Sequence, residues 1–134
     1  MFRPIVFSVI IAGFFLISSS FIQKFDLAKS VQRGKEVYMG NCISCHMVDG
    51  AGSDIYPPVA KTDYLKKPAK ELINIILQGQ SGEITVNKKK YDILMPAQPY
   101  LSDEQVSDVL NYIRNSMGNK YTTPITPAQV KALR

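Results

Sequence analysis

The two cysteines and the single histidine of this 134-residue chain fall within one short run, Cys42-Ile43-Ser44-Cys45-His46. Chance rarely brings such scarce residues together. A C-x-x-C-H run is the attachment signature of a c-type haem. On one helical turn, the two thiols can each bond to a vinyl group of the same haem, and the next residue directs its imidazole at the iron. The motif therefore predicts a chain that folds around one covalently attached haem c.

Three other interpretations of these residues compete with haem attachment. A thioredoxin-like redox pair would lie in a βαβ pattern, whereas this region is predicted to be a helix followed by a loop. A structural disulfide between Cys42 and Cys45 would close a very tight loop. A zinc site needs about four ligands, and the chain has no further Cys or His. Haem attachment is the interpretation that these comparisons favour.

The first residues of the chain predict export. Arg3 precedes an almost wholly apolar stretch, and Ser18-Ser19-Ser20 supplies small residues for cleavage after Ser20. This is the pattern of a secretory signal peptide at residues 1–20. The alternative is an uncleaved membrane anchor, because the apolar run of residues 4–22 is just long enough to span a bilayer. Both alternatives place the remaining chain in the periplasm, on the side of the membrane where c-type haem is attached.

The charge of the exported chain is mild. The full chain carries a formal net charge of +5, and Arg3 is the only charged residue of the predicted signal peptide. No interleaved pattern of aromatic and basic residues supports a nucleic acid as partner. The remaining length corresponds to one domain, in which a large apolar cofactor would supply part of the core.

Hydrophobic periodicity predicts mainly helices. After a linker at residues 21–29, a first helix begins at Ser30 and runs close to the haem motif. Further helices are predicted over residues 68–79 and 102–118, because each has capping or breaking residues at its ends. A tail at residues 121–134 carries a short last helix.

One small β-hairpin is predicted before the last main helix. Residues 83–86 and 91–94 have the composition of short strands, with residues 87–90 as the turn between them. The hairpin leads directly into Met95-Pro96, and Pro96 keeps this loop extended.

Met95 is the best candidate for the second axial ligand of the haem iron, opposite His46. The other methionines are in the predicted signal, too close to the motif, or near the end of the last main helix: Met1, Met39, Met47 and Met117. The alternative is that Met95 only fills space in the core. A His/Met pair is the ligation of electron-carrying cytochromes.

With these motifs in place, the chain resembles a class I monohaem cytochrome c, of the periplasmic bacterial kind, over about residues 30–120. The C-x-x-C-H run, the Met95-Pro96 loop and Asn111-Tyr112-Ile113-Arg114 carry the resemblance. It implies a mainly α class I cytochrome c fold, with helices packed around a covalently bound haem and one small β-hairpin before the axial Met loop. It also implies that Cys42 and Cys45 bind the haem and that His46 and Met95 ligate the iron.

The resemblance extends to two supporting features. In the family, a backbone carbonyl of a proline-bearing loop accepts a hydrogen bond from the proximal imidazole, which fixes the ring. Pro57 is the first choice for this carbonyl and Pro58 is the second. Gly34 and Tyr38 resemble the positions where the first helix crosses the last, with Tyr112 packed nearby.

The function implied is that of a single-electron carrier, which cycles between Fe(III) and Fe(II) and is not an enzyme. Its partners would be a dehydrogenase, a reductase or a terminal oxidase that docks at the exposed haem edge, and a membrane only if residues 4–22 are retained. Alternatives are a fixed electron-entry subunit of a larger complex or, with a labile sixth ligand, a haem peroxidase. Six lysines are expected to flank the haem edge and steer an acidic partner, or else only to solvate the surface: Lys66, Lys67, Lys70, Lys88, Lys89 and Lys90.

Overall fold

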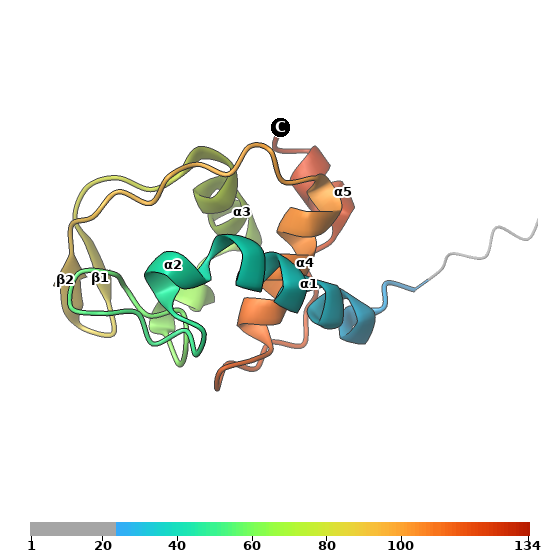
Figure 1. Cartoon of the computed structure of the whole chain (residues 1–134). Coiled ribbons are helices and arrows are strands. Elements are labelled where there is room, and N and C mark those ends of the chain that lie inside the picture. Colours follow the sequence, from blue (N-terminus) through green and yellow to red (C-terminus); the bar gives the residue numbers. More distant parts are fainter. Residues whose placement is uncertain (1–23) are drawn as a thin grey trace, which may run out of the picture.

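The computed structural model describes residues 24–134 (Figure 1), so the predicted signal peptide lies outside the described residues. The fold is helical with one small antiparallel hairpin, as the sequence predicts. None of the helices described is long and apolar enough to cross a membrane. The elements, in order, are α1 (Leu27–Asn41), α2 (Ile43–His46), a 3-10 helix (Asp63–Lys66), α3 (Ala69–Gln78), β1 (Ile84–Val86), β2 (Lys89–Tyr91), α4 (Asp103–Arg114) and α5 (Pro127–Lys131).

Helix α1 begins three residues earlier than the sequence analysis places it. The side chain of Asp26 accepts a hydrogen bond from the backbone N–H of Lys29 at 3.1 Å and so caps the helix at Leu27. An N-cap carboxylate satisfies one of the free donors of the first turn. The predicted linker at residues 21–29 is therefore too long, since its last three residues are helical.

Helices α1 and α4 cross in close contact, as Figure 1 shows. A Cβ atom at Gly34 would lie 1.9 Å from the carbonyl oxygen of Asp108, so only glycine allows this approach. The rings of Tyr38 and Tyr112 pack beside it with centroids 5.4 Å apart. Both features of the predicted helix crossing are confirmed.

The hairpin is tighter than predicted. Its turn consists of Asn87 and Lys88 alone, at φ 48° and 69°, and Ile84 pairs with Tyr91. Two left-handed residues form the kind of turn that suits a two-residue hairpin. Strand β2 therefore starts two residues early, and residues 92–94 leave the sheet and become exposed.

Helix α4 starts as predicted but ends early. Ser102 and Gln105 form the predicted capping box, with Gln105 N–H 3.1 Å from Ser102 Oγ. The helix ends at Arg114 rather than at Gly118, which lies in the turn beyond it at φ 83°. The four apolar residues predicted for its buried stripe are all buried: Val106, Val109, Leu110 and Ile113.

The C-terminal tail packs onto α4 and is part of the folded unit. Asn111 donates to the backbone carbonyl of Ile125 at 2.7 Å and accepts from the N–H of the same residue at 2.8 Å. Ile125 and Val130 are fully buried. The predicted short helix is present as α5, with its capping box at Thr126.

Candidate functional site

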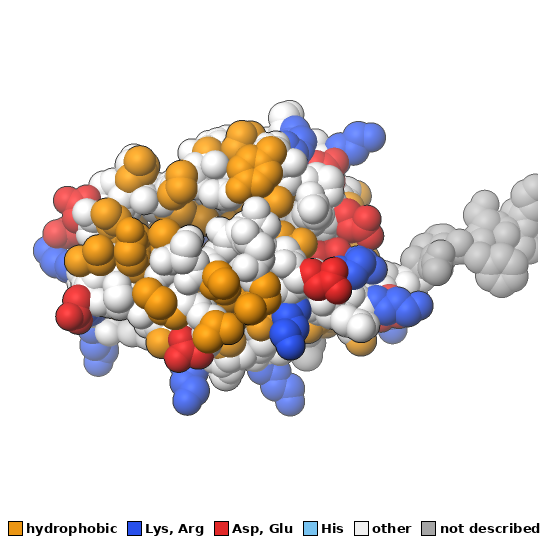
Figure 2. Space-filling view, viewed as in Figure 1, with side chains coloured by type: hydrophobic (Ala, Val, Ile, Leu, Met, Phe, Trp, Pro, Cys, Tyr) orange, Lys and Arg blue, Asp and Glu red, His pale blue; other side chains and the backbone are white. Residues whose placement is uncertain are grey.

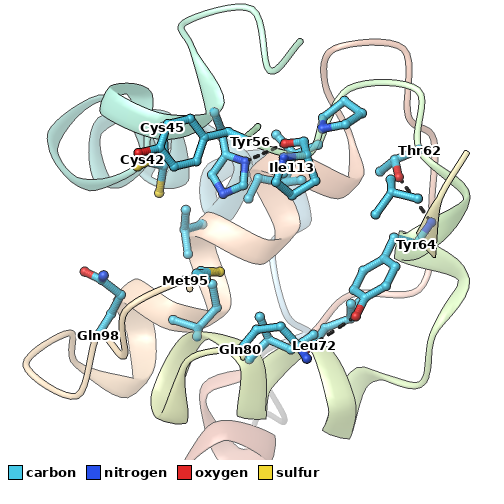
Figure 3. A pocket seen from close by; sticks show the side chains of 18 of the residues that line it. Cys42, Cys45, Tyr56, Thr62, Tyr64, Leu72, Gln80, Met95, Gln98 and Ile113 are labelled. Atoms are coloured by element: carbon cyan, nitrogen blue, oxygen red, sulfur yellow. Dashed lines mark hydrogen bonds between the residues drawn. The ribbon is translucent and has the colours of Figure 1, made fainter. Parts of the chain in front are cut away.

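An apolar cavity lies between the haem motif, α3, the hairpin, the segment 92–101 and α4 (Figure 3). Its wall is built largely from aliphatic side chains, and none of the described residues that line it is Asp, Glu, Lys or Arg. All four predicted haem-binding residues, Cys42, Cys45, His46 and Met95, line this one cavity. Residues that are up to 53 positions apart in the sequence are thus brought to one place.

His46 is held from behind by the proline-bearing loop. Its Nδ1 lies 2.9 Å from the carbonyl oxygen of Pro57, which confirms the first choice made from the sequence. A carbonyl oxygen only accepts hydrogen bonds, so Nδ1 carries the proton and Nε2 keeps a free lone pair. Burial lowers the pKa of His46, and the bond to Pro57 partly opposes this shift. The imidazole is therefore neutral and held in one orientation, with Nε2 available to bind a metal.

Backbone hydrogen bonds fold the loop that carries Pro57 back onto α2. The N–H of Gly52 donates to the carbonyl of His46 at 3.1 Å, and the N–H of Val59 donates to that of Gly50 at 2.8 Å. The hydroxyl of buried Tyr38 donates to the carbonyl of Met47 at 2.7 Å. These bonds attach the loop to α1 and α2, and so fix the distance between Pro57 and the imidazole.

Cys42 connects α1 to α2, and Cys45 lies within α2. The N–H of His46 donates to the carbonyl of Cys42 at 2.9 Å, so the two cysteines and the histidine share one helical turn. Both thiols are free rather than joined in a disulfide. Burial, with a smaller effect of Cys45, raises the pKa of Cys42 to about 11. Both thiols line the cavity and can bond to a group inside it.

Met95 lies across the cavity from the two cysteines, as Figure 3 shows. Its backbone forms a two-bond bridge with Gln80, in which Gln80 N–H donates at 3.0 Å and Met95 N–H donates at 2.9 Å. A third bond joins Gln98 N–H to the carbonyl of Ile76 at 2.8 Å. The segment is thereby attached to the end of α3 at the methionine itself and again three residues after it.

Gly79 permits this attachment, a role that the sequence does not predict. It ends α3 as predicted, at φ 79° and ψ −177°, a conformation that is essentially restricted to glycine. A Cβ atom there would lie 2.5 Å from the carbonyl oxygen of Met95. The glycine therefore both ends the helix and admits the segment that carries the methionine.

The other methionines of the described residues do not line the cavity. Met39 and Met47 are each 38% exposed. Met117 packs behind the His46 loop, where a Cβ atom on Gly50 would lie 2.5 Å from its sulfur. Among residues 24–134, Met95 alone presents a thioether to the cavity.

Tyr64 and Gln80 supply polar groups to the cavity wall. The hydroxyl of Tyr64 donates to Oε1 of Gln80 at a long 3.4 Å, and Figure 3 shows both side chains away from the cysteines. Neither residue is predicted from the sequence. No local motif marks them, because they lie 16 positions apart in the sequence and meet only in the folded chain.

The residues present fit a haem. Two thiols on one turn, an imidazole nitrogen with a free lone pair and a thioether on the facing wall are the donor set of a covalently bound, six-coordinate haem. The aliphatic wall suits a large flat apolar ring. The polar groups of Tyr64 and Gln80 suit its carboxylates.

Comparison with known proteins gives a consistent picture. The Cytochrome c family model matches residues 31–117. The chain is 33% identical over 117 residues to cytochrome c-552 of Thermus thermophilus. This match covers 81% of this chain and 78% of the Thermus protein. It is 32% identical over 104 residues to the cytochrome c subunit of the quinone-type alcohol dehydrogenase of Gluconobacter oxydans, and 37% identical over 108 residues to the gluconate 2-dehydrogenase cytochrome c subunit of Pantoea cypripedii. These matches cover 75% and 77% of this chain, but only 22% and 24% of the two subunits.

Proposed function

The chain belongs to the cytochrome c family, and we propose that Cys42 and Cys45 hold its haem covalently while His46 and Met95 are the axial ligands. As a class I monohaem cytochrome c, the protein is an electron carrier with covalently attached haem c. The observation that carries the ligand assignment is the apolar cavity that these four side chains share.

Each part of the chain has a distinct task in this proposal. The bound haem supplies a one-electron iron couple. The carbonyl of Pro57 orients the imidazole of His46 and increases its basicity as a ligand. The bridge to Gln80 positions Met95, and the aliphatic wall excludes water. If His46 and Met95 both ligate the bound iron, no coordination position would be left for a substrate, and we propose that the protein has no catalytic activity of its own.

We propose that the protein carries electrons in the periplasm between a dehydrogenase and a reductase or terminal oxidase. The matches to cytochrome subunits of dehydrogenases support such a partner. They equally support the alternative that the protein is a fixed electron-entry subunit of a larger complex. Cleavage after Ser20 favours the free carrier, and N-terminal sequencing should then find a mature chain that begins near Phe21. Recovery of residues 4–22 in the membrane fraction would favour the fixed subunit.

Replacement of Met95 by Ala tests the axial ligand. The variant should keep its haem, lose the sulfur-to-iron charge-transfer band and have a midpoint potential lower by on the order of 0.1 V, because thioether ligation raises the potential. The control is Met117→Leu, which keeps the volume behind the His46 loop and should retain both properties. An unchanged band and potential in Met95→Ala would show that this methionine only fills space.

The covalent bonds have a separate test. The Cys42→Ala/Cys45→Ala double variant, expressed in a strain competent for haem attachment, should lack covalent haem by mass spectrometry of the intact chain. The wild-type chain should have the mass of the polypeptide plus one haem. A wild-type mass equal to that of the bare polypeptide would contradict the assignment of both thiols.

A further inference from the structure

Exposed apolar side chains gather around the opening of the cavity. Figure 2 shows this face, with hydrophobic side chains on both sides of a hollow. Two of them line the cavity, and the other four lie within two residues of a residue that lines it. We call this set the apolar rim; its members are each at least 37% exposed and are Met47, Val48, Ile55, Ile93, Leu94 and Tyr100.

The apolar rim differs from ordinary exposed apolar residues. Single apolar side chains are common on protein surfaces, whereas apolar side chains grouped in one patch mark an interaction site. The rim comes from three separate segments of the chain: the residues after α2, the loop before Pro57, and the segment 92–101. Its most exposed members include Leu94 at 65% and Tyr100 at 68%. Three segments that expose apolar groups at one opening form a surface suited to a partner.

The charged residues that neighbour the rim in the sequence are acidic. The charged residues adjacent in sequence to a rim residue are Asp49, Asp54 and Asp92. None of the six lysines expected at the haem edge lines the cavity. In Figure 2, most Lys and Arg side chains lie toward the outline of this face.

Several of those lysines are also paired with acidic residues. Lys67 lies 2.9 Å from Glu71, and Lys90 lies 2.9 Å from Glu83. Lys89 lies 3.5 Å from Asp54, beside the rim. Half of the six lysines are thus paired, and a strongly acidic partner surface would meet carboxylates near the opening. Like charges at an interface oppose association.

We propose that the apolar rim is the docking surface for a redox partner protein whose own contact surface is apolar and lacks a cluster of acidic groups. This inference rests on the proposed function, because electron exchange with a group in the cavity requires the partner to cover the opening. Contact through apolar area rather than opposite charge makes association largely independent of ionic strength. It also selects against the acidic surfaces that a ring of lysines would attract.

The test uses the haem-loaded protein and gold electrodes coated with alkanethiol monolayers, which serve as partner surfaces of known chemistry. We expect adsorption and the fastest interfacial electron exchange on a mixed methyl- and hydroxyl-terminated monolayer. The rate there should change by less than about twofold between low and physiological ionic strength. Exchange on a carboxylate-terminated monolayer should be slower at both ionic strengths.

Matched variants show whether the rim makes the contact. Val48 and Ile55 are 61% and 59% exposed and do not line the cavity, so Val48→Glu and Ile55→Glu should leave the absorption spectrum and the sulfur-to-iron band unchanged. Each should lower the exchange rate on the methyl-containing monolayer by roughly fivefold or more. Ala28→Glu adds the same charge at an exposed position near the start of α1 and should leave the rate unchanged.

Several outcomes would overturn the docking proposal. The first two are faster exchange on the carboxylate-terminated monolayer and equal exchange rates for the rim and control variants. The third is the formation of concentration-dependent dimers that Val48→Glu abolishes, and the fourth is binding to neutral phosphatidylcholine vesicles that Val48→Glu abolishes. The last two would assign the rim to a second copy of this chain or to a lipid surface. Failure of the proposed function has a different signature: a chain without covalent haem by mass gives no redox signal on any monolayer.

Discussion

The crossing of α1 and α4 and the segment 92–101 both depend on a close approach, but different contacts hold them. At the crossing, Gly34 lies against α4, and the buried carboxylate of Asp108 binds side chains of α1. The segment is largely exposed, and backbone hydrogen bonds at Met95 and Gln98 attach it to the end of α3. We therefore expect changes at the crossing to reduce stability without altering the haem, and changes at the segment to alter the axial ligand as well.

The largest expected effect on stability is that of Gly34→Ala. Its methyl group would lie 1.9 Å from the carbonyl oxygen of Asp108 and 2.8 Å from Cβ of Tyr112, so the helices must separate. We expect a loss of about 3 kcal/mol in the free energy of unfolding, the upper part of the range for overpacking. Denaturant unfolding of the haem-loaded protein measures this value.

Gly40→Ala is the matched control on the same helix. No atom lies within 4 Å of a Cβ atom there, and alanine favours an exposed helix by about 0.5–1 kcal/mol. The control should therefore be neutral or slightly stabilising. Equal losses for the two variants would show that the close approach at Gly34 does not set the stability of the crossing.

The second prediction concerns Gly79→Ala, on the other side of the comparison. Positive φ and the approach of its Cβ to 2.5 Å from the carbonyl oxygen of Met95 both oppose alanine. We expect a loss of about 2 kcal/mol together with a weaker sulfur-to-iron band and faster binding of added imidazole to the oxidised protein. Gly82→Ala, also at positive φ but with no atom within 4 Å of the new Cβ, should lose stability without these changes in the spectrum. An unaltered sulfur-to-iron band in Gly79→Ala would show that the attachment of the segment to α3 does not determine the position of Met95 at the iron.

Features with a local signal could be predicted from the sequence. The C-x-x-C-H run brings the two thiols and the imidazole together within one turn, and the capping box at Ser102 marks the start of α4. Pro57 and Gly34 followed from the family resemblance, and the structure places both as predicted. The same local motifs and the family resemblance predict that the four proposed haem-binding residues share one cavity, and the structure has all four in its lining.

The remaining features depend on contacts between distant residues or on weak local signals. The pairing of Gln80 with Met95 joins two loops, and no pattern in either loop indicates it. The hairpin turn uses Asn87 and Lys88 at positive φ without a glycine, so the usual turn signal is absent. This shift of the turn moves Ile93 and Leu94 out of the predicted strand and makes them exposed members of the apolar rim.

The smallest expected effect is that of Asp108→Asn, which tests whether the crossing can weaken without any change at the iron. The carboxylate is 2% exposed and accepts from Ser30 Oγ at 2.5 Å and from Arg33 Nε at 2.6 Å. Asparagine keeps the shape of the side chain, but its amide nitrogen replaces an accepting oxygen and faces a hydrogen-bond donor of Ser30 or Arg33. We expect a loss of about 1.5 kcal/mol, which is modest because the Arg33 side chain is 45% exposed and can rehydrate.

Glu104→Gln is the matched control, since Glu104 is the other acidic partner of Arg33, at 3.1 Å, and is 61% exposed. Its loss should stay below about 0.5 kcal/mol. Both variants should keep the charge-transfer band and midpoint potential of the wild-type protein, because Asp108 lies on the side of α4 that faces α1 and does not line the cavity. A lower potential in Asp108→Asn would mean that strain at the crossing reaches the axial ligands through α4, and the two regions would then not be separable.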